Sequence, residues 1–205
     1  MKLVPPDGTD TLKIPGWSKV LEMARIPARY LRVPRSVALD RELALWAEKH
    51  GESWSVLVHG PTGSGKTWIA VRLMGAICEA HLKRWEADPN IPKIRCRFVD
   101  ASDWIERQKV GIRDESDRHV YDEAAKAHYL LLDDLGAERL TDYALDRLSL
   151  LLRHRHAYEL PTIVTTNAKG LDALASGFDR RVASRFAEGI VFQTQSSDRR
   201  ARKGP

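Results

Sequence analysis

The chain has 205 residues, with 33 Lys or Arg against 28 Asp or Glu and a formal net charge of +5. This length allows one ordinary domain, and a hydrophobic content of 43% indicates a folded rather than a disordered protein. No apolar stretch approaches the roughly 18 residues of a membrane span, and no secretory signal is recognisable, so we expect a cytoplasmic protein. The two cysteines, Cys78 and Cys96, have no metal-site spacing and are expected to be small buried apolar residues.

The positive charge is concentrated at the two ends of the chain. Residues 1–36 have a net charge of +4 and residues 198–205 a net charge of +3, which leaves −2 for the remaining body. Residues 1–25 are rich in Pro and Gly and predict a flexible basic arm with one short helix near 17–25, followed by one domain over 26–197 and a basic tail over 198–205. We expect these ends to supply most of the nonspecific attraction to a nucleic acid or another acidic surface.

Helical and strand patterns alternate along the domain. Helices are expected over 36–50, 66–85 and 178–186, after Thr141, and as a pair around Gly111 within 102–128. Short apolar runs bounded by turn residues predict strands over 54–59, 94–100, 129–134, 162–167 and 189–193. Five strands with intervening helices predict a three-layer α/β fold around a parallel sheet.

A glycine-rich loop lies between the first expected strand and a long helix. Its sequence, GPTGSGKT, satisfies the phosphate-loop pattern GxxxxGK[ST]. Glycines allow backbone N–H groups to turn toward a phosphate, and the following helix offers its positive end to the same anion. We therefore expect ATP here, with the Lys on the β and γ phosphates and the Thr on Mg²⁺. The residues of the loop are Gly60, Pro61, Thr62, Gly63, Ser64, Gly65, Lys66 and Thr67.

Polar residues close two later strands. The apolar run 129–134 ends in Asp133 and Asp134, and carboxylates placed after a buried strand are costly unless a cation is near. We expect Asp133 to hold Mg²⁺ and Asp134 to orient or deprotonate an attacking water. Asn167, after the next strand, either holds the same water or simply closes its strand.

Two arginines lie four residues apart in the expected last helix. Arg181 and Arg185 therefore share a helix face, which either reaches the γ-phosphate of a neighbouring subunit or is a solvated basic surface. One extra strand separates the phosphate loop from the carboxylate strand. This spacing is typical of the RecA and AAA+ branch rather than of nucleotide kinases or Ras-like GTPases.

The segments GPTGSGKT, LLLDDLG, PTIVTTN and RVASRF, in this order, resemble the DnaC/IstB-like AAA+ ATPases, which include phage-encoded helicase loaders. The resemblance covers residues 26–200 and includes the Ile-Pro segment at 26–30, which in such proteins lies near the adenine. It implies a P-loop ATPase fold of AAA+ type with strand order 5-1-4-3-2 and no carboxyl-terminal helical lid. By this resemblance the Walker A residues are Lys66 and Thr67, the Walker B residues Asp133 and Asp134, sensor 1 Asn167, and the arginine finger Arg185 with Arg181 beside it.

The resemblance also implies a function. It predicts a slow, oligomer-dependent ATPase with ATP and Mg²⁺ as cofactors, self-associated in a ring or spiral on single-stranded DNA, that loads a replicative DNA helicase. The missing lid removes the usual sensor 2 arginine, for which Arg199 or Arg200 could substitute. An IstB-like transposition helper acting on duplex DNA is the alternative, and a small-molecule kinase is a more distant one.

The helical pair over 102–128 is where this family contacts single-stranded DNA. Among six tryptophans, Trp104 is the candidate for base stacking, whereas Trp46 and Trp68 are expected in the core. Acidic residues are interspersed in the same segment, so a solvated surface is the alternative for its basic side chains. The basic candidates are Lys109, Arg113, Arg118 and Lys126.

Overall fold

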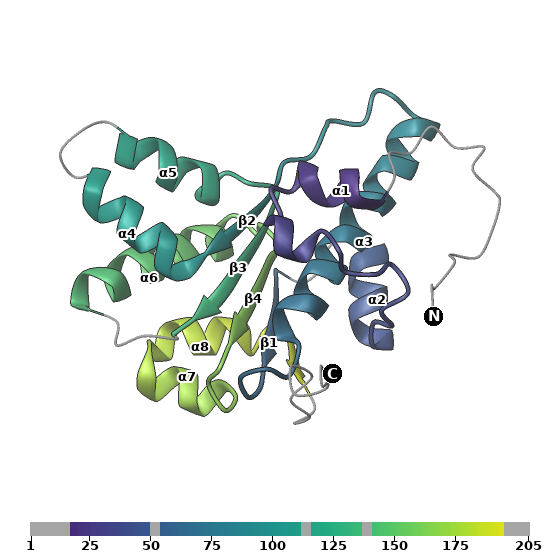
Figure 1. The fold of residues 1–205 in the computed structure, drawn as a ribbon. Helices are drawn as coiled ribbons and strands as arrows, with labels where there is room; N and C mark the ends of the chain where they lie inside the picture. Colours follow the sequence, from purple (N-terminus) through teal and green to yellow (C-terminus); the bar gives the residue numbers. More distant parts are fainter. Residues whose placement is uncertain (1–16, 50–53, 112–115, 137–140, 195–205) are drawn as a thin grey trace.

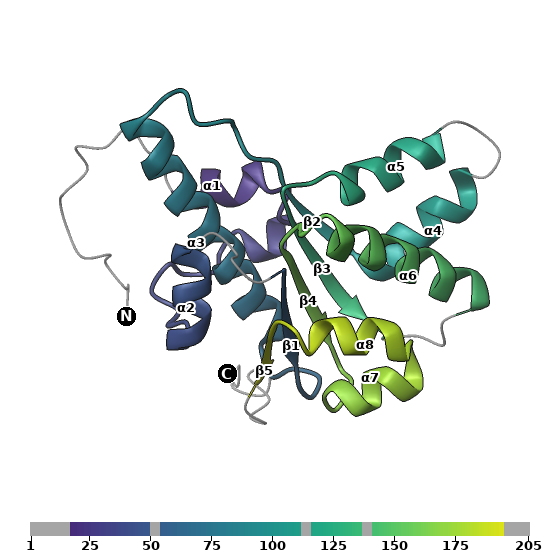
Figure 2. The ribbon, with the colours of Figure 1, turned by 180° about the vertical axis from the view of Figure 1, so that it is seen from behind.

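The computed structural model describes residues 17–49, 54–111, 116–136 and 141–194. Its centre is a five-stranded sheet with helices on both faces (Figure 1, and from behind in Figure 2). All strand pairs are parallel and the spatial order is β2-β3-β4-β1-β5, which confirms the expected order 5-1-4-3-2. The strands are β1 (Ser55–His59), β2 (Cys96–Asp100), β3 (Tyr129–Leu135), β4 (Thr162–Thr166) and β5 (Ile190–Gln193).

The helices form two layers. One face of the sheet is covered by α1 (Trp17–Met23), η1 (Ala28–Tyr30), α2 (Arg41–Glu48) and α3 (Lys66–Ala87). The other face is covered by α4 (Ala101–Gly111), α5 (Ser116–Ala125), α6 (Asp142–Ala157), α7 (Leu171–Gly177) and α8 (Arg180–Phe186). No described helix is long and apolar enough to cross a membrane.

Burial on both faces explains the continuous apolar runs of the strands. Leu131 packs with the α3 layer, whereas Leu130 and Leu132 pack with the α6 layer. Successive side chains of a strand point to opposite faces, so a strand covered on both sides must be apolar at every position. The sequence LLLDD therefore specifies a central strand whose polar residues begin where the helices no longer cover it.

Side-chain caps set the helix starts. Thr141 Oγ1 accepts a hydrogen bond from Ala144 N at 3.3 Å, which confirms the expected start of α6. The helix expected over 36–50 begins at Arg41, because Asp40 accepts from Glu42 N at 2.9 Å. The helix expected over 178–186 begins at Arg180 for the same reason, and the sequence did not predict α7, which precedes it.

Part of the expected flexible arm belongs to the folded domain. Within 17–25, α1 buries Val20 and Leu21 in the core, and the Ala24 carbonyl accepts a hydrogen bond from Phe98 N at 2.9 Å. This stretch therefore packs with the core of the domain, because its apolar residues lie against α3 and its backbone bonds to β2. The segment 26–30 also lies against β2, with the Tyr30 ring centroid 6.1 Å from that of Phe98.

Two sets of residues expected in the core can be compared with the structure. Cys78 and Cys96 are both buried, as expected, and their Sγ atoms lie 3.1 Å apart between α3 and β2. The contact with Cys78, together with burial, raises the pKa of the Cys96 thiol. Trp46 is buried, but the prediction for Trp68 is wrong: its side chain is 38% exposed in the first turn of α3.

Candidate nucleotide-binding site

The phosphate loop connects the end of β1 to the start of α3. Gly60, Gly63 and Gly65 have φ angles of +146°, +81° and +92°, a region that side chains with a Cβ rarely adopt. At Gly60 a Cβ would lie only 2.2 Å from Thr194 Oγ1, so no larger residue fits. The eight residues 60–67 thus form one continuous turn into the positive end of a 22-residue helix.

Lys66 joins this loop to the end of β4. Its buried ammonium group donates to the Pro61 carbonyl at 2.9 Å and to Asn167 Oδ1 at 2.7 Å. Asn167 lies here because β4 pairs with β1 in parallel, so both strands end at the same edge of the sheet. The structure therefore places the two residues within hydrogen-bond distance, although 101 positions separate them in the sequence.

Asp133 lies beside Thr67, near the end of β3. Its carboxylate accepts hydrogen bonds from Thr165 Oγ1 at 2.6 Å and from Thr67 Oγ1 at 3.2 Å. The side chain is only 5% exposed, and this burial raises its pKa above the ordinary value for Asp despite the two hydroxyl donors. A buried carboxylate with a raised pKa is a place where a cation would be favourable.

Asp134 is turned toward Asn167 by a β-bulge. β3 and β4 pair Leu132 with Val164 but Leu135 with Thr166, so β3 carries one extra residue in this stretch. The extra residue is accommodated at Asp134, which has a φ of +60°, a conformation that is less favourable for Asp than for Gly. Asn167 Nδ2 then donates to Asp134 Oδ1 at 2.8 Å.

Thr165 is a residue of this site that the sequence analysis did not assign. Its hydroxyl donates to the Asp133 carboxylate and accepts from the Asp134 backbone N–H at 2.8 Å, so it positions the Asp133 side chain and the Asp134 backbone. The available signal was a hydroxyl residue near the end of a central apolar strand, two positions before Asn167. A buried hydroxyl needs partners, and the neighbouring strand end supplies them.

The donor set fits a magnesium ion. Thr67 Oγ1 and Asp133 Oδ2 lie 3.2 Å apart, and hydroxyl and carboxylate oxygens are ligands that Mg²⁺ accepts. Among the described residues no group of three or more His, Cys, Asp or Glu could hold a metal by itself. A site with few protein ligands is what Mg²⁺ uses when phosphates and water complete its coordination.

The backbone of Arg185 lies away from the loop of its own chain. The Arg185 side chain runs back along α8, where Nη1 donates to the Arg181 carbonyl at 2.8 Å. The Arg185 carbonyl accepts from Trp54 Nε1 at 2.7 Å, and Trp54 also stacks on Phe186 at 5.0 Å. Trp54 precedes β1, whereas the loop follows it, so about 20 Å of strand separates the two ends.

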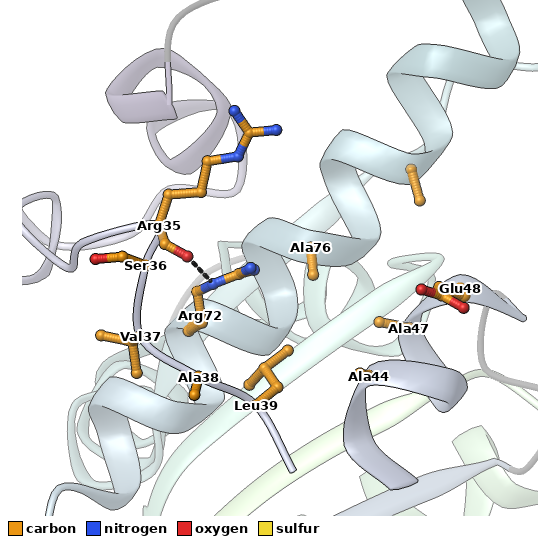
Figure 3. A pocket seen from close by; sticks show the side chains of 11 residues that line it. Arg35, Ser36, Val37, Ala38, Leu39, Ala44, Ala47, Glu48, Arg72 and Ala76 are labelled. Atoms are coloured by element: carbon orange, nitrogen blue, oxygen red, sulfur yellow. Dashed lines mark hydrogen bonds between the residues drawn. The ribbon is translucent and has the colours of Figure 1, made fainter. Parts of the chain in front are cut away.

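A separate groove lies along the outer side of α3. Its volume is about 370 Å³, and it is lined by the segment 35–39, α2 and the middle of α3 (Figure 3). Arg72 crosses it and donates from Nε to the Arg35 carbonyl at 2.8 Å. No residue of the phosphate loop lines this groove, so it is distinct from the candidate nucleotide site.

The described candidates for DNA contacts differ in exposure. Trp104 is only 2% exposed and donates to the Val120 carbonyl, so its ring is not available for base stacking. Lys109 is exposed and paired with Glu106, and Lys126 is exposed and paired with Asp122. The positions of Arg113 and the Arg118 side chain lie outside the described part, as do Arg199 and Arg200.

No protein-family model matches this sequence, and no curated protein matches it. Several solved structures share its fold. The DnaC helicase loader matches with a TM-score of 0.68 at 23% identity, over 82% of this chain and 100% of that chain. DnaI matches with a TM-score of 0.63 at 21% identity, over 84% of this chain and 93% of that chain.

The replication initiator DnaA, bound to AMPPCP and single-stranded DNA, matches with a TM-score of 0.63 at 18% identity. The match covers 83% of this chain and 51% of that chain, so this chain spans about half of the DnaA length. At these identities the likeness shows the fold. The chain therefore has the three-layer α/β P-loop fold of AAA+ type that its sequence resembles.

Proposed function

We propose that this chain is an AAA+ switch that binds and hydrolyses ATP in DNA replication and loads a replicative helicase on single-stranded DNA. The observation that best supports a nucleotide site here is that Lys66, Asp133 and Asn167 lie together at one edge of the sheet. They come from the ends of three different elements, and each is within hydrogen-bond distance of another member of the site. A chance glycine-rich turn would not have these partners.

The residues divide the work of phosphoryl transfer between them. Loop N–H groups and the α3 terminus hold the phosphates, and Lys66 leaves its Pro61 and Asn167 partners for the β and γ phosphates. Thr67 and Asp133 would hold Mg²⁺, which would neutralise charge on the phosphate oxygens. Asp134 and Asn167 share a hydrogen bond, and together they orient the attacking water.

Arg185 is proposed to complete the site of a neighbouring copy. In its own chain Arg185 is anchored near the start of β1, at the far end of the strand from the loop. An arginine on the outside of α8 can reach a γ-phosphate only across a subunit interface, where it offsets charge that develops during transfer. This arrangement makes hydrolysis depend on assembly into a ring or spiral.

Nucleotide binding is tested by thermal unfolding with ATP and Mg²⁺. Saturating ligand at about 100 times Kd should raise the Tm of the wild type by about 5–10 °C. The variant Lys66→Ala should lose this shift, and Lys83→Ala, an exposed lysine later in α3, should retain it. An equal shift in the Lys66 variant would refute the assignment of the loop.

The shared site is tested by mixing two inactive variants. Lys66→Ala lacks the phosphate contact, and Arg185→Ala lacks the finger, but a mixed assembly contains sites with both groups. The Arg185 variant alone should hydrolyse ATP about a thousandfold more slowly than the wild type at assembling concentrations. Mixing should restore part of the rate, whereas Arg153→Ala on exposed α6 surface should be active alone. A mixture without recovery would mean that Arg185 does not act across subunits.

The proposal of a helicase partner and a DNA partner rests on the fold shared with DnaC and DnaA. The DnaC structure is that of a helicase loader, and the DnaA structure contains single-stranded DNA. We expect ATP-dependent capture of a cognate replicative helicase, and DNA affinity that falls steeply with salt. A preference for duplex over single-stranded DNA in the same titration would favour the transposition-helper alternative instead.

The contribution of the basic ends to DNA binding is tested by truncation. The amino-terminal cut lies before α1, because this helix packs in the core. Removal of residues 1–16 and 198–205 takes away basic residues without touching Val20 or Leu21 of the core. DNA affinity should fall while ATP binding is kept. Unchanged DNA affinity would mean that other surfaces make the contacts with phosphates.

A further inference from the structure

A hydroxyl that follows the edge strand next to β1 lies against the phosphate loop. Thr194 follows β5, and its backbone N–H donates to the His59 carbonyl at 2.8 Å, continuing the pairing of β5 with β1. Its Oγ1 lies 2.6 Å from Ser64 Oγ, in the middle of the loop. The two residues are 3% and 2% exposed, so water does not compete for this contact.

The hydrogen positions of this contact follow from its partners. Thr194 Oγ1 also lies 3.1 Å from the His59 carbonyl, which can only accept, so the Thr194 hydrogen points there. The Ser64 hydroxyl must then donate to Thr194 Oγ1. The result is a chain of two bonds that runs from the loop, through Thr194, to the end of β1.

The phosphate loop leaves room for the Thr194 hydroxyl. Gly60 has no Cβ where Thr194 Oγ1 approaches, and Ser64 stands between Gly63 and Gly65, both at positive φ. Glycines make this turn possible, but they also leave it many other conformations. A fixed contact at Ser64 restricts those alternatives before a ligand arrives, and preorganisation of this kind raises affinity.

We infer that Thr194 is a positioning residue for the phosphate loop, and that its hydroxyl raises nucleotide affinity by holding Ser64. The inference rests on the proposed nucleotide site and adds a residue outside the phosphate-loop motif to it. Thr194 does not touch the phosphates in this account. Its backbone bond to His59 holds β5 in place without the hydroxyl, so the fold and the loop can be affected separately.

The test compares isosteric and conservative variants by calorimetric titration with AMPPCP and Mg²⁺. Thr194→Val keeps the shape and the backbone bond but removes the hydroxyl, and should weaken binding about five- to tenfold. Thr194→Ser restores the oxygen and should bind within about twofold of the wild type. Ser149→Ala, which removes a buried hydroxyl bond to Asp179 between α6 and α8, is the matched control and should bind normally.

A double-mutant cycle separates a local contact from general damage. Ser64→Ala alone should weaken binding as Thr194→Val does, and the double variant should be no weaker than either single one. Additive losses, a Val variant that binds like the wild type, or a Ser variant as weak as the Val variant would each overturn the inference. A wild type that does not bind AMPPCP would instead overturn the proposed nucleotide site.

Discussion

The two edges of the sheet each contain a buried polar network, but the networks are of different kinds. At the carboxyl edge, Lys66 donates to Asn167, Asn167 donates to Asp134, and Asp133 accepts from Thr67 and Thr165, so charged groups of both signs take part. At the amino edge, the Arg155 guanidinium is fully buried and bonds to backbone and hydroxyl oxygens rather than to carboxylates. Its acceptors are the carbonyls of Ala124, Ala125, Ala127 and Pro161 and the Thr162 hydroxyl.

The difference shows how a buried charge serves stability in one place and function in another. Burial lowers the pKa of Arg155 to about 9, and the group remains charged at neutral pH while it ties the end of α5 to the start of β4. Its donors are occupied by fixed backbone atoms, which no ligand can replace. The donors of Lys66 are held by a loop carbonyl and an amide side chain, which can yield to phosphate.

The largest expected effect is at Arg155. Arg155→Met leaves several buried carbonyls without donors, and should lower the free energy of unfolding by about 3 kcal/mol or more. Urea unfolding measures this, with Arg153→Met on the exposed side of α6 as the control. A loss below about 1 kcal/mol would show that water replaces the guanidinium, and the amino edge would not be a closed network.

A smaller effect of opposite sign is expected at Asp133. Burial raises the pKa of this carboxyl, so its contribution to stability is lost as the pH rises from the unfolded value through the raised folded value. At neutral pH, Asp133→Asn should therefore stabilise the ligand-free protein in urea unfolding, because it removes a buried charge. This gain in stability should vanish below about pH 4, where the Asp133 carboxyl is protonated in both the folded and the unfolded wild type.

The control for Asp133 is an exposed carboxylate, Asp172→Asn, which should change unfolding by a few tenths of a kcal/mol. The Asp133 variant should also lose the Mg²⁺-dependent part of the thermal shift with ATP. A destabilised Asn variant would mean that the carboxylate is held in its charged form by the fold, contrary to the comparison between the edges.

The smallest effect is expected at His128, near Arg155. Its Nδ1 accepts from Arg95 N at 2.9 Å, and burial, with Arg95 and Arg155 nearby, lowers its pKa. The contribution to stability is complete above about pH 6.5 and is lost as the pH falls through the folded pKa. Solvent screens this partly exposed ring, so His128→Gln should remove only a few tenths of a kcal/mol of acid sensitivity. His119→Gln, at an exposed position on α5, should leave the unfolding profile between pH 5 and 7 unchanged.

Much of the fold could be predicted because its signals are local. The apolar runs of the strands, the cap at Thr141 and the GPTGSGKT loop are each specified by a few neighbouring residues. Side-chain burial was less predictable: Trp68 and Trp104 have similar local patterns but opposite exposures. Which side of a helix meets the sheet depends on packing between elements that are distant in sequence.

The sequence by itself determined the phosphate loop, the carboxylates after β3 and the alternation that produces a parallel sheet, because these follow from local periodicity and motif chemistry. Only the tertiary structure decided the partners of those residues. The bulge that turns Asp134 toward Asn167, the Thr165 hydroxyl that bonds to the Asp133 carboxylate and the Asp134 backbone, and the Thr194 hydroxyl against Ser64 all arise where separate strand ends meet. Contacts of this kind depend on strand register and loop conformation, which no short stretch of the chain encodes alone.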